Sequence, residues 1–360
     1  MIYLDYNAST PLRPQAKEAL VETLSLTGNP SSPHHMGRKL RSLIDGARKE
    51  ILDKIEGERL IFTSGGTEAN ALALSSGEGV PILVSSIEHD SVLKAVKNTH
   101  LIPATEEGKV NLERLEMLLS SFEKPGLLSL MLVNNETGVI QPVKEVAQLA
   151  RSKGWKIHTD ASQALGHVPF SFKDLGVDLL TLSSHKCGGP IGIGALVTKK
   201  DLPLTPLIRG GGQEYGMRAG TLSAPLVVAF ATAVKEALKE SSAPLQRWRQ
   251  KIENALPEAV IYGKKAPRVT HVTCLGMPDV PAELQLMAFD LKGIAISAGA
   301  ACSSGTMKPS HVLTAMGISE KEARCAIRVS MGWKTQEEDI DQFIQEWQNI
   351  YYQHQVKEAS

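Results

Sequence analysis

The chain has no excess of charge of either sign, because 39 lysines and arginines balance 39 aspartates and glutamates over 360 residues. Such a balance gives no electrostatic footprint for nucleic acid or for an anionic membrane. No apolar run approaches the roughly 20 residues that a membrane-spanning helix needs. The first residues, MIYLDY, also lack the basic and apolar regions of an export signal. We therefore expect no direct nucleic-acid partner and no membrane partner.

Cysteine is scarce, with four in the whole chain and none in a CxxC pair typical of a metal site. This usage excludes a disulfide framework and favours a reducing compartment, so we expect a cytoplasmic protein without a bound metal. Aromatic residues make up only 5%, whereas a hydrophobic content of 42% and a charged content of 22% are ordinary for a globular protein. The length is sufficient for two domains.

Apolar segments alternate with helical ones between residues 59 and 200. Strands are expected at residues 59–62, 81–86, 127–133, 155–160 and 177–182. This alternation predicts an α/β fold with a mostly parallel central sheet and helices on both faces. Polar residues collect where the expected strands end, which is where open α/β sheets bind ligands.

The pattern changes after residue 243, where shorter helices and strands predict a smaller α+β domain. We expect a large domain over residues 14–243 and a small domain formed by residues 1–13 and 244–360. Residues 297–305 are all small and include one thiol, Cys302, so the small domain is expected to carry this cysteine on a loop.

Lys186 follows an expected buried strand and precedes a glycine-rich turn. A lysine in a dry site can lose its proton near neutral pH and bind an aldehyde as a Schiff base. An isolated loop lysine is more often a solvated surface residue, so the position of Lys186 alone leaves both interpretations open.

Three further signals are weak separately. The turn at residues 63–70 could bring backbone N–H groups to a phosphate, or could simply join a strand to a helix. Asp160 could pair with a ring N–H, or could cap the helix that follows it. His89, after another expected strand, could stack on a ring. Together with an aldehyde-binding lysine, these features fit pyridoxal 5'-phosphate.

Several segments together carry a resemblance to a known family. They are residues 4–11, 28–32, 63–70, 88–89, 133–136, 160–163, 183–186, 210–221, 327–332 and the loop around Cys302. With them the chain resembles a cysteine desulfurase, a pyridoxal-phosphate enzyme of the class V aminotransferase family with fold type I. The resemblance runs over nearly the full length.

The resemblance implies roles around the cofactor. Lys186 would hold the aldehyde and later move protons. His89 would stack on the ring and act as an acid or base, Asp160 would pair with the ring nitrogen, and Gln163 would bond the phenolic oxygen. The phosphate would be bound by Gly66, Thr67, Ser183 and His185.

The same resemblance implies a second subunit and a substrate. Thr221 would reach the phosphate in the neighbouring subunit, which implies a homodimer. Asn135 and Arg328 would hold the carboxylate of L-cysteine, the arginine through a two-pronged ion pair.

Cys302 would attack the substrate sulfur as a thiolate and keep it as a persulfide, leaving L-alanine. The other thiols, Cys187, Cys274 and Cys325, are interpreted as small buried residues. The loop around Cys302 resembles the longer version in this family, which implies delivery of sulfur to an acceptor or scaffold protein for iron–sulfur clusters or thiolated RNA.

Two alternatives stay open at this point. One is a selenocysteine lyase or another class V lyase or transaminase, which Cys302 disfavours because a transaminase needs no thiol there. The other is a sulfur-relay partner with little turnover, which the complete set of expected catalytic residues disfavours.

Overall fold

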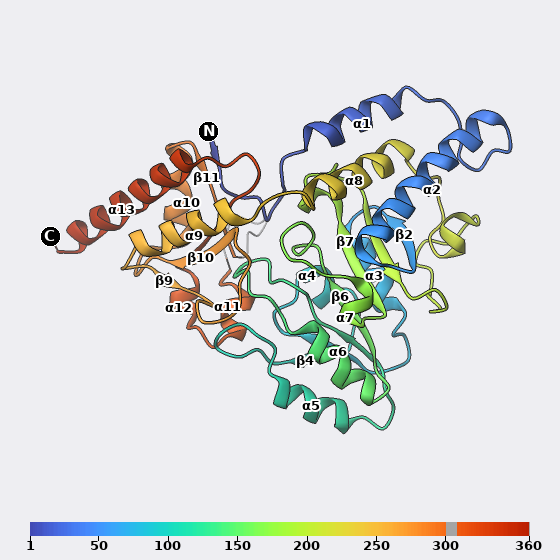
Figure 1. Cartoon of the computed structure of the whole chain (residues 1–360). Helices are drawn as coiled ribbons and strands as arrows, with labels where there is room; N and C mark the ends of the chain where they lie inside the picture. The colour runs from blue at the N-terminus through green and yellow to red at the C-terminus, as the bar shows by residue number, and fades with distance from the viewer. Residues whose placement is uncertain (300–307, 360) are drawn as a thin grey trace.

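The computed structural model describes residues 1–299 and 308–359. Cys302 therefore lies outside the described residues. Figure 1 shows a larger part built around a sheet and a smaller part that contains the C-terminal helix and lies beside the N-terminus.

Seven of the described strands form the central sheet in the order β2-β8-β7-β6-β5-β3-β4. Their bounds are β2 Arg59–Thr63, β8 Gly194–Thr198, β7 Leu179–Ser183, β6 Lys156–Asp160, β5 Leu127–Ser129, β3 Ile82–Ser85 and β4 His100–Ile102. Strands β7, β6, β5, β3 and β4 run parallel to one another, whereas β8 runs antiparallel to both β2 and β7. The expected mostly parallel sheet is confirmed.

Helices cover both faces of this sheet. They are α1 Pro14–Leu24, α2 His35–Ile55, α3 Gly66–Ser75, α4 Asp90–Leu93, α5 Leu112–Ser121, α6 Val143–Ser152, α7 Phe172–Leu175 and α8 Ala224–Ala237. In β2, Leu60 and Phe62 pack with α2 and α8, whereas the intervening Ile61 packs with α3. Because successive strand residues point to opposite faces, this alternation places two apolar layers on the two sides of the sheet.

A second core lies in the remaining part of the chain. An antiparallel sheet joins β12 Ser297–Ala298, β13 Ala326–Ser330, β10 Val272–Gly276 and β9 Val260–Ile261. Its helices are α9 Ala243–Ala255, α10 Ala282–Leu291, α11 His311–Ala315, α12 Glu320–Ala323 and α13 Glu337–Ala359. Phe289 and Phe343 stack in this core with their ring centroids 5.1 Å apart.

The N-terminal arm packs with this second core, although it is distant in sequence. Strand β1 (Ile2–Tyr3) pairs in parallel with β11 (Ile294–Ala295), and Leu4 is fully buried in the same apolar cluster. This packing supports a proposed division into a large domain at 14–243 and a small domain at 1–13 and 244–360.

The apolar run at 127–133 forms a shorter strand than expected, because β5 ends at Ser129. Leu130 and Leu132 are buried beyond that point and donate backbone hydrogen bonds to His158 and Asp160. A continuous apolar run predicts that its residues are buried, but it does not predict where the strand ends, since buried loop residues are apolar as well. Among the described residues, no helix has both the length and the apolar character needed to cross a bilayer.

Candidate active site

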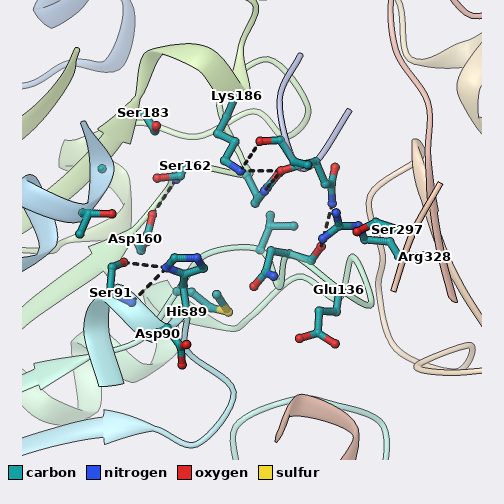
Figure 2. A pocket seen from close by; sticks show the side chains of 18 of the residues that line it. His89, Asp90, Ser91, Glu136, Asp160, Ser162, Ser183, Lys186, Ser297 and Arg328 are labelled. Carbon is teal, nitrogen blue, oxygen red and sulfur yellow. Dashed lines mark hydrogen bonds between the residues drawn. The ribbon is translucent and has the colours of Figure 1, made fainter. Parts of the chain in front are cut away.

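A cavity of about 480 Å³ lies where β6 and β7 end, and residues of the small sheet close its other side. Figure 2 shows Asp160 and His89 on one side and Arg328 on the other, with Lys186 reaching in between. The cavity brings together these sequence-predicted residues: Gly66, Thr67, His89, Asn135, Asp160, Gln163, Ser183, His185, Lys186 and Arg328.

Lys186 ends a short 3₁₀ turn, η1 (Ser184–Lys186), that directly follows β7. Its Nζ donates hydrogen bonds to the carbonyl oxygens of Asn7 at 2.6 Å and Ala8 at 3.0 Å. Burial, with a smaller contribution from the Arg328 guanidinium, lowers the pKa of Lys186 to about 8. The amine is therefore able to lose its proton close to neutral pH.

Asp160 ends β6 and is 7% exposed. Its Oδ2 accepts a hydrogen bond from Asn70 Nδ2 at 2.8 Å, and its Oδ1 accepts one from the backbone N–H of Ser162 at 2.9 Å. The second contact is local and caps a turn, because residues 162–167 form turns and not the helix that the capping alternative required. The first is a long-range contact. Both hold the carboxylate in one orientation at the cavity wall.

His89 precedes α4 and is connected to Asp160 through other side chains. Its Nδ1 accepts the backbone N–H of Ser91 at 3.1 Å and lies 2.7 Å from Ser91 Oγ. Asn70 Nδ2 donates to this same Oγ at 2.8 Å and to Asp160. Burial lowers the pKa of His89, so its ring is neutral, with Nδ1 as the acceptor and the proton assigned to Nε2.

The amino end of α3 forms a third wall of the cavity. Gly66 and Thr67 begin this helix, whose backbone N–H groups favour an anion. A Cβ added at Gly66 would lie 3.2 Å from the Cβ of Ser183 and 3.3 Å from Ser162 Oγ, so glycine keeps this corner open. Burial lowers the pKa of His185 to about 4, with the Lys186 charge contributing, so this imidazole is neutral at neutral pH.

Arg328 on β13 supplies the cation on the opposite side and is 6% exposed. Its Nη2 pairs with Asp5 Oδ1 at 2.7 Å, and its Nη1 donates to the carbonyl oxygen of Asn135 at 3.0 Å. Within the described residues, Arg328 Nε and Asn135 Oδ1 are buried without a hydrogen-bond partner. The free N–H at Arg328 Nε fits an acceptor such as a bound carboxylate, whereas Asn135 Oδ1 is an acceptor and fits a bound donor.

The family model described as "Aminotransferase class-V" matches residues 2–343. A cysteine desulfurase of Cereibacter sphaeroides is 37% identical over 365 residues, which cover 96% of this chain and 94% of that protein. The chain belongs to the cysteine desulfurase family.

Solved structures agree with this assignment. A NifS-like protein from Rickettsia africae has a TM-score of 0.91 and 33% identity, with coverage of 98% of this chain and 99% of that chain. A structure described as SspA in complex with cysteine has a TM-score of 0.81 and 30% identity, with coverage of 92% and 99% respectively. The fold predicted from the resemblance, that of fold type I pyridoxal-phosphate enzymes, is confirmed by these similarities.

The residues of the cavity fit the pyridoxal phosphate on which this enzyme family depends. Lys186 offers an amine with a lowered pKa to an aldehyde, and Asp160 offers an oriented carboxylate to a ring nitrogen. The open corner at Gly66 lies beside Ser183 at the amino end of α3, where a phosphate would be favoured. These residues offer groups for the aldehyde, the ring nitrogen and the phosphate of a phosphorylated pyridine aldehyde.

One predicted site residue that the structure describes, Thr221, is exposed and does not line the cavity of its own chain. Cys302 lies outside the described residues. Gln163 is at the cavity, where its Nε2 donates to the carbonyl oxygen of Asn7 at 3.0 Å. Cys187 is buried, and burial raises the pKa of its thiol to about 12, the opposite of an activated thiolate.

Sequence reasoning assigned no role to several residues that organise the cavity. Asn70 orients Asp160 across 90 residues of sequence, and Asp5 pairs with Arg328 across 323 residues. Asn7 and Glu136 also line the cavity. All four residues belong to the segments that carried the resemblance. The sequence therefore marked their segments, but it did not show which distant residue each side chain contacts.

Proposed function

We propose that this chain removes the sulfur of L-cysteine, leaves L-alanine, and holds the sulfur as a persulfide on Cys302. The observation that carries the proposal is that a half-buried amine, Lys186, and a buried guanidinium, Arg328, line the same cavity. Arg328 would bind the carboxylate of an α-amino acid, and the amine of the same molecule would react with the aldehyde that Lys186 holds. The relative described in complex with cysteine supports this class of substrate.

Pyridoxal phosphate would be held by Lys186 at its aldehyde, by Asp160 at its ring nitrogen and by Gln163 at its phenolic oxygen. The amino end of α3, with Gly66 and Thr67, would bind the phosphate. Ser183 and His185 would add side-chain contacts to it. The cofactor would supply an electron-withdrawing ring for the carbon next to the substrate amine.

The protein's own groups would then bind the substrate and move protons. Arg328, together with Asn135, would hold the substrate carboxylate, because the guanidinium has an unused N–H at Nε. Lys186 Nζ, with its pKa of about 8, can release and take up a proton beside the reacting carbon. The neutral His89 would stack on the ring and supply a second acid or base.

Sulfur transfer would be completed by the thiolate of Cys302. The Cβ–S bond of the substrate breaks, a new S–S bond forms at Cys302, and the electron pair stays with the carbon fragment. A proton added to that carbon gives alanine. Release of sulfide from the persulfide then requires an external thiol as reductant.

The destination of the sulfur and the assembly are also proposals. We infer a homodimer in which Thr221 reaches the phosphate of the neighbouring subunit, because Thr221 is away from the cavity of its own chain. An acceptor or scaffold protein for iron–sulfur clusters or thiolated RNA would take the persulfide. A cytoplasmic location is consistent with Cys187, Cys274 and Cys325 being free thiols.

The test is sulfide and alanine production from L-cysteine by the purified protein with pyridoxal phosphate and a reductant. Lys186→Ala should lose the covalently bound cofactor. Cys302→Ala should keep the cofactor absorbance and lose sulfide release, whereas Cys325→Ser, which removes a thiol that does not line the cavity, should retain both. Equal sulfide release by Cys302→Ala would contradict its role, and turnover of selenocysteine alone would favour a selenocysteine lyase.

A further inference from the structure

Asn7 lies in the N-terminal arm and is 3% exposed. We propose that Asn7 is a positioning residue whose backbone carbonyl fixes the amine of Lys186 and whose side chain ties that carbonyl to the carboxylate end of the site. The inference rests on the proposed role of Lys186 and concerns how its amine is held.

The carbonyl oxygens of two consecutive residues form the cradle for this amine. Lys186 Nζ donates to Asn7 at 2.6 Å and to Ala8 at 3.0 Å. The Asn7 carbonyl also accepts from Gln163 Nε2 at 3.0 Å, so one oxygen orders two predicted cofactor-binding side chains. Carbonyl acceptors stabilise the protonated amine, so they oppose the lowering of its pKa by burial. The pair of carbonyls is therefore a defined position for the amine when it is free.

Asn7 is held from three directions by groups far away in the sequence. Its backbone N–H donates to Ser330 Oγ at 3.0 Å on β13. Its Nδ2 donates to the carbonyl oxygen of Asn135 at 2.9 Å, the same oxygen that accepts from Arg328 at 3.0 Å. Its Oδ1 faces His271 Nε2 at 3.1 Å. The amine end and the carboxylate end of the site thus share one fixed residue.

His271 is the remote support of this arrangement. Because Asn7 Nδ2 is occupied as a donor, Asn7 Oδ1 is the acceptor, which assigns the His271 proton to Nε2. His271 stacks on His167 with ring centroids 3.6 Å apart, and burial lowers the pKa of both rings, that of His167 to about 4. Both imidazoles are neutral at working pH, so His271 donates one uncharged hydrogen bond.

The position of His271 allows Asn7 to be tested without a change in the cavity, which His271 does not line. His271→Leu removes the donor to Asn7, and His271→Gln keeps an N–H donor. His167→Phe is a matched control, because it retains a ring against His271 and leaves the bond to Asn7. Asn7→Ala removes the side-chain links directly.

Two measurements report on the amine. The first is the rate at which the cofactor-free full-length protein captures added pyridoxal phosphate, followed by absorbance between about pH 6 and 10, since only the unprotonated amine reacts. The midpoint should be about 8 in the unchanged protein. The second is kcat and KM for L-cysteine with the holoenzyme.

The charges that act on the amine stay constant across these variants. Arg328 lowers the pKa of Lys186, whereas Asp160 and Asp5 raise it. Two imidazoles, His89 and His185, also face the amine and have lowered pKa values. None of these groups is replaced, so a shift in the midpoint reports the carbonyl cradle.

His271→Leu and Asn7→Ala should move the midpoint to lower pH, because the ammonium loses fixed acceptors. They should also lower kcat about tenfold while KM changes less than about twofold, as for the loss of one uncharged hydrogen bond that positions the reacting group. His271→Gln and His167→Phe should behave like the unchanged protein. If Asn7→Ala does not fold, the comparison of His271→Leu with His271→Gln decides by itself.

An unchanged midpoint and an unchanged kcat in folded His271→Leu would overturn the inference and leave the proposed function intact. A Lys186→Ala protein that still captured the aldehyde covalently at the cavity would instead overturn the proposed function. The two failures are therefore distinguishable.

Discussion

Arg328→Lys tests whether the cavity recognises an amino-acid carboxylate. The planar guanidinium of Arg328 contacts Asp5 at 2.7 Å and the Asn135 carbonyl at 3.0 Å, and its Nε remains available to a ligand. Lysine keeps the positive charge but lacks this planar group. A charge-assisted hydrogen bond contributes about 1.5–3 kcal/mol. Loss of about 2–3 kcal/mol of substrate binding corresponds to a decrease in kcat/KM of roughly 30- to 160-fold. Most of it should appear in KM, because the carboxylate is bound equally before and during the reaction.

Arg268→Lys is a matched control for this change. Arg268 is as buried as Arg328, with side-chain exposures of 5% and 7%, and it bonds Glu253 at 2.8 and 3.0 Å. It does not line the cavity. Both variants should unfold at lower temperature than the unchanged protein, because each breaks a buried ion pair. Only Arg328→Lys should lose kcat/KM for L-cysteine.

Cysteamine, which is cysteine without the carboxylate, completes the assay. The unchanged protein and Arg328→Lys should capture cysteamine at the cofactor with the same affinity, measured by the change in absorbance. A kcat/KM for L-cysteine within about twofold of the unchanged protein, or an equal loss of affinity for cysteamine, would refute carboxylate binding by Arg328.

Two further expectations concern a glycine and a thiol. Gly66→Ala should raise the dissociation constant of pyridoxal phosphate about tenfold, or about 1.4 kcal/mol, because the added Cβ would lie 3.2 Å from the Ser183 Cβ. Equilibrium dialysis would measure this constant, and an unchanged affinity would exclude a phosphate at this corner. Cys187, whose pKa burial raises to about 12, should resist iodoacetamide in the folded protein at neutral pH and react in denaturant, since the thiolate is the reactive form. Mass spectrometry of the labelled peptides would check this, and rapid labelling of the native protein would show that the thiol is accessible.

The positions and directions of the strands could be predicted from the sequence only in part. The strand predicted at 155–160 is confirmed by β6 at Lys156–Asp160, because an apolar segment with a polar end is typical of a parallel strand. The antiparallel direction of β8 could not be read, because hydrophobic periodicity does not depend on which way a strand runs. The end of β5 at Ser129 was missed for a similar reason, since the residues after it are equally buried.

The amino-acid sequence by itself determined which reactive side chains this protein has and which strand or turn each of them follows. The lysine after β7 and the aspartate at the end of β6 are fixed by local pattern, because a parallel sheet brings the ends of its strands to one edge. Only the tertiary structure decided what each group touches. Asn7 holds the lysine amine across 179 residues and meets His271 across 264, and such contacts depend on how two cores pack together. Periodicity is a local property of the chain, so it cannot specify these pairs.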